Sequence, residues 1–244
     1  MATKDGPQPI VTNGLIFYID PGNTRSHTSG SSDITSMDNY NGYTGSFQST
    51  DVIYSNDGNG SLLFDGTTGD AVHFPSFQSI GLPAQNLTWQ GWAKAVTQGS
   101  YDTIVSTAGS SPSTDGGAIY WRDHFGTSKY YADFNFGAGS TRKYPEAANG
   151  ATSLNLVEEW NEITWTYNGS NTIIYLNGVL GESEAVTGDI NDLDEIKSLG
   201  GDATAMGTSH MWDGNITCVR MYNRALTQAE ITQNYNALKS RFGK

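Results

Sequence analysis

Two short segments near the middle of the chain combine aromatic and polar residues at a spacing suited to ligand binding. Trp121 is followed two residues later by Asp123, and Tyr131 is followed at the same spacing by Asp133 and Asn135. Residues two apart in a β-strand point to one face of the sheet, so each segment would place a ring beside polar groups. Sugars are held by an exposed aromatic face together with planar hydrogen-bonding groups. These residues are candidate carbohydrate-binding residues, and core packing or protein contact is the alternative.

Three aspartates are candidate ligands for a cation. Asp65 and Asp70 flank the sequence G-T-T-G, and Asp202 follows Gly200 and Gly201. Carboxylates and loop carbonyls are the hard oxygen ligands that Ca²⁺ prefers, so calcium is a candidate cofactor. The alternative is that these Asp and Gly residues stand here because they form turns.

Other catalytic and cofactor-binding patterns are missing from the sequence. The 4 histidines share no metal-ligand spacing. The single cysteine, Cys218, rules out an intramolecular disulfide and is expected to be a small core residue. No phosphate-binding or dinucleotide-binding glycine motif occurs.

The charge balance excludes some classes of partner. Lys and Arg number 13 against 25 Asp and Glu, which gives a formal net charge of −12. Nucleic acids and anionic membranes are bound by clustered basic residues, so we expect neither as a partner. No apolar run of about 18 residues predicts a membrane-spanning helix. The first residues lack the apolar core of a signal peptide, so we expect no secretion.

Most of the chain is expected to form short β-strands separated by turns. Residues 61–65 and 70–74 are expected to form a hairpin, as are residues 161–167 and 171–177. Asn177-Gly178 then predicts a further reversal. The pattern as a whole indicates an all-β sandwich in a single domain. The expected strands lie at 14–20, around Phe47, and at 52–54, 61–65, 70–74, 86–95, 101–107, 118–123, 129–136, 161–167, 171–177, 195–201 and 215–223.

One amphipathic helix is predicted at the C-terminal end, over residues 227–242. Thr227 is the expected N-cap, and Glu230 completes a capping box with it. Leu226, just before the helix, is expected to pack on Ile231 as a hydrophobic staple. The predicted buried stripe consists of Ile231, Tyr235, Leu238 and Phe242.

Five segments stand out in order along the chain. They are G-L-I-F-Y-I-D (14–20), G-S-L-L-F-D-G-T-T-G-D-A-V (60–72), N-L-T-W-Q-G-W (86–92), W-N-E-I-T-W-T-Y-N-G with I-I-Y-L-N-G (160–178), and W-D-G-N-I-T-C-V-R-M-Y-N-R-A-L-T-Q-A-E-I (212–231). Together they resemble the laminin-G-like, concanavalin A-like lectin/glucanase family. The resemblance implies a two-sheet antiparallel jelly-roll sandwich with one C-terminal helix, in a single domain over residues 1–244 with 1–13 as an N-terminal arm. Many members of this fold hold one Ca²⁺ between an Asp and loop carbonyls.

The two ends of the chain narrow this resemblance. Residues 223–243, N-R-A-L-T-Q-A-E-I-T-Q-N-Y-N-A-L-K-S-R-F-G, resemble the closing segment of virion structural proteins of tailed phages, notably marine phages and cyanophages. Residues 14–26 and 38–47 are also similar to theirs. The resemblance implies a non-enzymatic surface component of a bacteriophage virion, such as a capsid decoration or a fibre-knob-like part. It would be assembled in the host cytoplasm, would be oligomeric in the particle, and would bind other virion proteins of the capsid or tail.

Two further expectations concern partners and activity. The basic end of the helix, Lys239 to Lys244, is a candidate docking point for an acidic partner. The alternative function is a carbohydrate-binding adhesin that recognises host-surface glycans. Enzymes that resemble this chain carry paired carboxylates in the pattern E-x-D-x-x-E on one strand. No glutamate here is followed by Asp at the second position, so we expect no enzyme activity.

Overall fold

The computed structural model describes most of the chain. Within 117–128 the side chain of Ile119 is the only one described, and at 197 only the backbone is described. The described residues are 8–27, 31, 33–35, 42–67, 69–76, 78–97, 102–106, 117–124, 127–137, 141–147, 157–191, 197–201 and 210–244.

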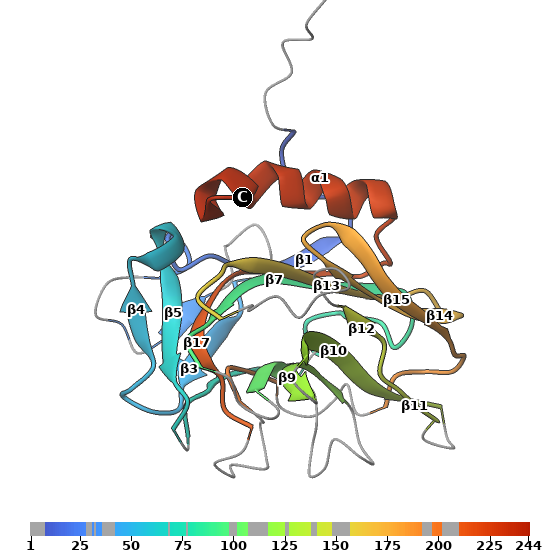
Figure 1. Ribbon diagram of the computed structural model, residues 1–244, viewed down its shortest axis with the longest axis horizontal. Helices are drawn as coiled ribbons and strands as arrows, with labels where there is room; N and C mark the ends of the chain where they lie inside the picture. The colour runs from blue at the N-terminus through green and yellow to red at the C-terminus, as the bar shows by residue number, and fades with distance from the viewer. Residues whose placement is uncertain are drawn as a thin grey trace, which may run out of the picture.

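The described parts of the chain form two antiparallel sheets packed face to face, with one α-helix over the outer face of one sheet (Figure 1). The all-β jelly-roll sandwich with a C-terminal helix is confirmed. The first sheet runs in the order β15-β14-β13-β7-β17-β5-β4, and β1 pairs with β17. Its strands are β1 (Leu15–Ile19), β4 (Ile53–Ser55), β5 (Ser61–Asp65), β7 (Leu87–Ala95), β13 (Asn161–Tyr167), β14 (Asn171–Leu176), β15 (Val179–Ala185) and β17 (Asp213–Tyr222).

The second sheet runs in the order β11-β10-β9-β8-β16-β6-β3-β2, and β12 pairs with β10. It lies below the first sheet in Figure 1, on the side away from the helix. Its strands are β2 (Asp33–Thr35), β3 (Thr44–Phe47), β6 (Val72–Phe74), β8 (Asp102–Ser106), β9 (Gly117–His124), β10 (Thr127–Phe136), β11 (Thr141–Lys143), β12 (Glu146–Ala147) and β16 (Lys197–Leu199).

The main core lies between the sheets and follows from the alternation of apolar residues. In β7, Leu87, Trp89 and Ala93 point into this core, as expected for a strand with one buried face. Phe134 of β10 and Trp165 of β13 stack across the interface, with ring centroids 3.9 Å apart and planes 4° from parallel. The two sheets are therefore held together by large side chains from both inner faces.

The predicted hairpin of residues 161–167 and 171–177 is confirmed as β13 paired with β14. Asn177 and Gly178 then reverse the chain with φ values of 53° and 77°. Positive φ at both positions is the geometry of the tight turn that Asn-Gly favours. The strand that follows this turn, β15, was not among the predicted strands, because its residues V-L-G-E-S-E-A are largely exposed.

The predicted hairpin of residues 61–65 and 70–74 is wrong. β5 pairs with β17 and β4 in the first sheet, whereas β6 pairs with β16 and β3 in the second. The segment between them therefore crosses from one sheet to the other. Phe64 and Val72 are both fully buried in the main core, where each strand finds its apolar contacts with its own sheet.

The C-terminal helix α1 (Gln228–Leu238) begins as predicted. Thr227 is the N-cap, and the capping box with Glu230 is formed in both directions. The helix ends earlier than expected, because the last predicted turn is a separate 3₁₀-helix, η3 (Lys239–Phe242). A second 3₁₀-helix, η2 (Asp57–Asn59), precedes β5. Among the described residues no helix has the length and apolar character needed to span a membrane.

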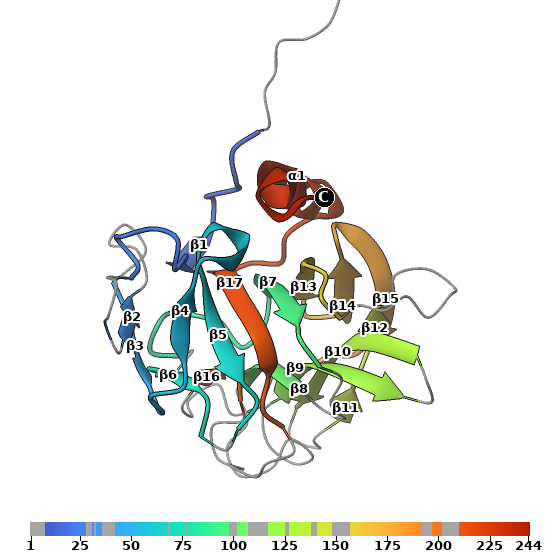
Figure 2. The ribbon, with the colours of Figure 1, turned by 60° about the vertical axis from the view of Figure 1, so that its left-hand side comes forward.

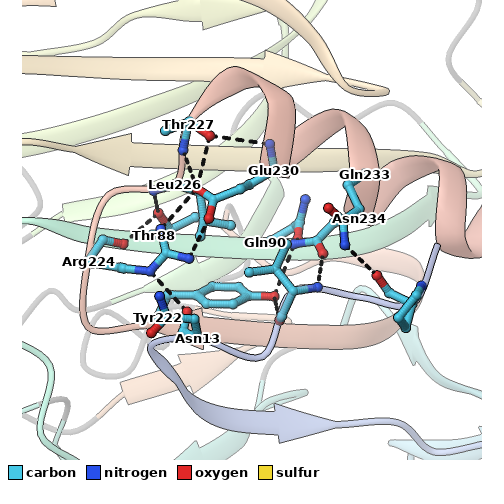
Figure 3. Close-up of polar contacts among 12 residues, drawn as sticks. Asn13, Thr88, Gln90, Tyr222, Arg224, Leu226, Thr227, Glu230, Gln233 and Asn234 are labelled. Atoms are coloured by element: carbon cyan, nitrogen blue, oxygen red, sulfur yellow. Dashed lines mark hydrogen bonds and ion pairs between the residues drawn. The ribbon is translucent and has the colours of Figure 1, made fainter.

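Helix α1 packs on the outer face of the first sheet and forms a second core there. The predicted staple and stripe residues all lie in this core, which also buries Cys218. Trp92 of β7 stacks on Phe242 with ring centroids 4.1 Å apart. Asn234 joins three segments, because its amide nitrogen donates to Gln90 of β7 and Tyr222 of β17, and its oxygen accepts from the N–H of Val11 (Figure 3). The helix is thus an integral part of the fold.

The basic end of the helix does not present free charge to a partner. Arg241 binds Asp20, and Lys244 Nζ lies 2.8 Å from Glu159 Oε2. Lys239 lies over the ring of Tyr235 at 5.7 Å. These cations already contact groups of the same chain, and the docking point for an acidic partner stays a prediction.

One open edge of the sandwich is closed by a column of aromatic rings (β2, β3 and β4 in Figure 2). His27 stacks on Phe47 of the second sheet at 6.1 Å and on Tyr54 of the first sheet at 5.6 Å. Its Nδ1 lies 3.0 Å from the carbonyl oxygen of Asp33. The opposite edge, where β15 meets β11 and β12, is polar.

Candidate functional site

The outer surface of β10 and of the chain that follows it carries the candidate site. Tyr130, Ala132, Phe134 and Phe136 of β10 are buried in the main core. Because side chains alternate along a strand, Tyr131, Asp133 and Asn135 lie on the opposite face of β10. Tyr131 is half-buried there, whereas Asp133 and Asn135 are buried, Asn135 completely. Three of the predicted carbohydrate-binding residues are therefore on one face of one strand, as the sequence predicts.

The strand register places three further residues on this face. Asn135 pairs with Arg142 of β11, and Tyr131 pairs with Glu146 of β12. Both pairs belong to the same register. Between them, the N–H of Ala132 donates to the carbonyl oxygen of Pro145 at 3.2 Å. The position opposite Asp133 is therefore Tyr144.

Tyr131 and Tyr144 are diagonal neighbours on adjacent chain segments. Diagonal positions in an antiparallel pair are about 7–8 Å apart, within reach of aromatic side chains. Tyr131 is half-buried, whereas Tyr144 is 58% exposed and is the most exposed aromatic side chain described. An exposed ring next to a strand that carries a second ring offers a surface for stacking.

An ion pair lies on each side of these tyrosines, along the same diagonal direction. On one side, Arg142 binds Asp133 through two parallel hydrogen bonds, with Nε 2.7 Å from Oδ1 and Nη2 donating to Oδ2. On the other side, Lys129 Nζ donates to Glu146 Oε1. The face therefore alternates ion pair, tyrosine pair, ion pair. We call these six residues the tyrosine face: Lys129, Tyr131, Asp133, Arg142, Tyr144 and Glu146.

Strand β15 of the first sheet supports the tyrosine face from behind. The N–H of Tyr144 donates to Glu184 Oε1 at 3.1 Å, and the N–H of Glu146 donates to Glu182 Oε2 at 3.2 Å. Lys143 Nζ lies 3.2 Å from Glu184 Oε2. These bonds join the edges of the two sheets and fix the backbone on which Tyr144 stands. β10, β11, β12 and β15 lie together at the right of Figure 1.

The other two predicted sugar-binding positions lie on a different face. In the backbone register Trp121 pairs with Tyr130, and Asp123 pairs with Ser128. Opposed residues of an antiparallel pair share a face, so positions 121 and 123 are on the core side of the sheet. The side chains of Trp121 and Asp123 lie outside the described residues, and the structure does not bring these positions together with Tyr131.

Sequence reasoning missed Arg142, Tyr144 and Glu146. Its last strand before 161–167 ended at residue 136, and Pro145 interrupts the alternation that would have revealed the next one. A signal was nevertheless present, because residues 142, 144 and 146 repeat at the spacing of two that places side chains on one face.

The candidate calcium ligands Asp65 and Asp70 lie together. Asp70 accepts from the N–H of Asp65 at 2.9 Å and from the hydroxyl of Ser49. The N–H of Thr67 donates to Asp65 Oδ1 at 2.9 Å, as in an Asx turn. Turn chemistry thus accounts for both residues, and Asp202 lies outside the described part of the chain. Calcium binding stays a prediction.

The two carboxyl groups also influence each other's ionisation. Burial, and then the neighbouring Asp65, raises the pKa of Asp70. A hydrogen bond with Asp70 lowers the pKa of Asp65. In the described ranges no group of three His, Cys, Asp or Glu side chains is arranged to hold a metal ion.

The charged groups of the tyrosine face are matched to one another. Its carboxylates are each held by a cation, Asp133 by Arg142 and Glu146 by Lys129. Charged pairs of this kind fix planar donors and acceptors in place. Together with two tyrosines they form a surface that offers both ring stacking and directional hydrogen bonds.

Comparison with known families gives one match. Residues 64–232 match the family described as the Concanavalin A-like lectin/glucanases superfamily, Laminin_G_3. A comparison with curated protein sequences finds no match.

Solved structures share the fold at low sequence identity. The receptor-binding domain of botulinum neurotoxin type G has 16% identity and a TM-score of 0.62, covering 91% of this chain and 51% of that chain. A structure of botulinum neurotoxin type C, whose cell entry is described as dependent upon interaction with two ganglioside molecules, has 14% identity and a TM-score of 0.66, covering 92% and 51%. This chain therefore spans about half the length of those neurotoxin chains.

A third structure is matched over nearly its whole length. Domain 4 of AbnA, a GH43 extracellular arabinanase from Geobacillus stearothermophilus in complex with arabinotriose, has 13% identity and a TM-score of 0.62. The match covers 91% of this chain and 98% of that chain. Because the sequence identities are this low, the three matches show a common fold and nothing further.

Proposed function

This chain belongs to the concanavalin A-like lectin/glucanases superfamily, and from that membership we propose that it is a non-catalytic carbohydrate-binding domain. Its contact surface is the tyrosine face. The observation that carries the proposal is the pair Tyr131 and Tyr144, set between two ion pairs on one outer sheet surface.

The chemistry of this surface suits a sugar. The C–H faces of a pyranose or furanose ring pack on aromatic rings, and its hydroxyls need donors and acceptors at fixed positions. Tyr144 offers an exposed ring, and Arg142, with 43% of its side chain exposed, offers guanidinium N–H groups. The strands and the bonds from β15 hold these groups in place before a ligand arrives, which reduces the entropy lost on binding.

The comparisons support the same function. One similar structure is an arabinanase domain in complex with arabinotriose, and another concerns ganglioside interaction by a neurotoxin. The arabinanase domain is matched over 98% of its length, so its sugar complex is a binding event on this fold, whereas the match to the neurotoxin covers 51% of that chain. A non-catalytic role also agrees with the absence of the paired-carboxylate pattern E-x-D-x-x-E from the sequence.

A glycan array followed by calorimetric titration tests the proposal. The wild-type domain is expected to bind a defined set of glycans, and Tyr131→Ala and Tyr144→Ala are each expected to weaken binding about tenfold, which corresponds to about 1.4 kcal/mol. Tyr54→Ala is the matched control, because Tyr54 is also a partly exposed tyrosine but stands on β4, at the opposite edge of the sandwich.

Two outcomes would contradict this function. One is the absence of binding to any glycan at millimolar concentration. The other is binding that Tyr54→Ala weakens as much as Tyr131→Ala and Tyr144→Ala do. Thermal unfolding of each variant shows that a loss of binding does not come from a loss of fold.

A second role is compatible with the first. We also propose that the chain is a surface component of a tailed-phage virion, because residues 14–26 and 223–243 resemble segments of such proteins. A glycan-binding domain on a particle would act as an adhesin for host-surface sugars. Mass spectrometry of purified particles of the phage that encodes the chain tests this role, and a particle without the chain would exclude it.

A further inference from the structure

We infer that the tyrosine face selects uncharged glycans over acidic ones. The inference rests on the proposed glycan-binding function and names the class of ligand for the same site. The inference follows from the ion pairs of the face, in which each cation is bound to a carboxylate of the same chain.

Every cation described at this face lies in contact with a carboxylate. Lys129 is paired with Glu146, and Arg142 with Asp133. At the adjoining edge, Lys143 is paired with Glu184 at 3.2 Å. Three cations thus meet three carboxylates, and Glu182 of β15 adds a fourth carboxylate at this edge.

Taking Arg142 away from its partner would be costly. The side chain of Asp133 is only 8% exposed, whereas that of Arg142 is 43% exposed. A sugar carboxylate that captured the guanidinium would leave the carboxylate of Asp133 buried without its cation. The free energy lost when a buried ion pair is broken exceeds the free energy gained when an exposed ion pair forms. Arg142 is thereby held to the protein and is not available as an anion receptor.

The surrounding charge acts in the same direction. Glu182 and Glu184 lie on β15 behind Tyr144 and Glu146, and the whole chain carries a formal net charge of −12. An approaching uronate or sialate would meet a repulsive field at low ionic strength. An uncharged sugar would not.

An uncharged hydroxyl group does not compete with the charged groups for their partners. A hydroxyl group both donates and accepts, so it can bond to polar groups of the face without separating an ion pair. Arabinotriose, the ligand named for the similar arabinanase domain, is an uncharged sugar of this kind.

The test compares each acidic oligosaccharide with its own methyl ester, for example an oligogalacturonate and its methyl-esterified form. The ester keeps the ring, the linkage and the length, and it replaces the charged carboxylate by a neutral methyl ester. Neutral oligosaccharides and the esters are expected to bind at least tenfold more tightly than the free acids. Binding of the neutral forms is expected to be unchanged between low and high salt.

Two variants reverse the preference if the inference is right. Asp133→Asn releases Arg142 and Glu146→Gln releases Lys129, so each is expected to gain binding to the free acids, in a salt-sensitive manner. Two substitutions on separate ion pairs keep the test informative if one of them impairs folding. Glu159→Gln, which releases Lys244 at a distant pair, is the control and is expected to leave the preference unchanged.

The outcomes separate the inference from the function on which it rests. If free acids bind as tightly as their esters, and Tyr131→Ala and Tyr144→Ala abolish that binding, the selectivity is wrong and the glycan-binding function stands. If no oligosaccharide of either kind binds, both are wrong.

Discussion

Arg241, near the end of the chain, binds Asp20, which follows the first strand, through two hydrogen bonds. Nη1 lies 2.7 Å from Oδ2 and Nη2 lies 2.9 Å from Oδ1. The same guanidinium donates from Nε to the carbonyl oxygen of Gly58 at 2.6 Å and from Nη2 to that of Gly60 at 3.0 Å. One side chain therefore ties together the end of β1, the turn of η2 and the last turn of the chain.

Removing this side chain should destabilise the fold. Arg241→Ala leaves Asp20, which is 8% exposed, without its cation and leaves backbone carbonyls without donors. We expect the free energy of unfolding to fall by about 3 kcal/mol. Denaturant unfolding of the variant and the wild type measures the change.

Lys244→Ala is the control for Arg241→Ala. Lys244 also forms an ion pair near the end of the chain, but its partner Glu159 has 55% of its side chain exposed. Exposed pairs contribute about 0–1 kcal/mol. If both substitutions had equally small effects, Arg241 would not be the tie that its contacts indicate.

A second ion pair, Glu162 with Arg220, lies fully buried between the first sheet and the helix. Arg220 Nη2 is 2.8 Å from Glu162 Oε1, and both side chains are 0% exposed. Trp92 and Gln90 of β7 and Tyr235 of the helix also face the carboxyl group. Burial raises the pKa of Glu162 to about 7, although Arg220 opposes the rise.

This shift predicts a loss of stability with rising pH. The ordinary pKa of a glutamate is 4.5, so the folded protein holds this proton more tightly than the unfolded chain does. The contribution is complete below pH 4.5 and is lost as the pH rises through about 7, by an amount on the order of 3 kcal/mol. Glu162→Gln cannot ionise and should flatten the curve of unfolding free energy between these values. An unchanged slope in the variant would contradict the assignment.

Glu230 should show the opposite dependence on pH. The hydrogen bonds from Arg224 are the main cause that lowers its pKa to about 2, and the N–H of Thr227 adds to them (Figure 3). Because the folded value lies below the ordinary 4.5, this contribution is present above pH 4.5 and is lost as the pH falls towards 2.

Glu230→Gln removes the charge that closes the capping box. We expect a loss of about 1 kcal/mol at pH 7, the usual size of a helix cap. The loss should shrink in acid, because the wild-type carboxylate takes up its proton as the pH falls towards 2. Unfolding by denaturant at pH 7 and at pH 2 measures both values, and an equal difference at the two pH values would exclude a role for the charge.

The sequence predicts most of the strands and the helix for a physical reason. Thr227 with Glu230, and Asn177 with Gly178, act through contacts a few residues apart, and both local motifs are confirmed. The wrong hairpin between 61–65 and 70–74 has another origin. Which sheet a strand joins depends on partners such as β17 and β16, which lie far along the chain.

The candidate site was predicted only in part, because some of its residues are placed by local spacing and others by pairing with distant segments. The spacing of Tyr131, Asp133 and Asn135 places them on one face within a single strand, without reference to any other segment. Tyr144 joins them only through the register between β10 and the chain on either side of Pro145. Position 121 falls on the opposite face because it pairs with Tyr130. The register between two strands is set by packing and turn geometry. A shift of one residue would move every side chain of a strand to the other face of the sheet.

Gly200 lies against the ring of Phe64 in the main core. Gly200 has φ +80°, and a Cβ at this position would lie 2.2 Å from a ring carbon of Phe64. Gly81 has φ +85° and nothing within 4 Å of its would-be Cβ. Both positions carry similar backbone strain for an L side chain, about 1–3 kcal/mol, but only one of them adds a collision with a fully buried ring.

The comparison of Gly200→Ala with Gly81→Ala therefore isolates the packing of Phe64. We expect Gly81→Ala to lose about 1 kcal/mol. Gly200→Ala should lose about 1–3 kcal/mol more, the cost of overpacking a core that cannot expand. Chemical unfolding of the two variants gives the difference. Equal losses would mean that Phe64 moves aside freely, and the interior between the two sheets would then be less tightly packed than its buried aromatic rings indicate.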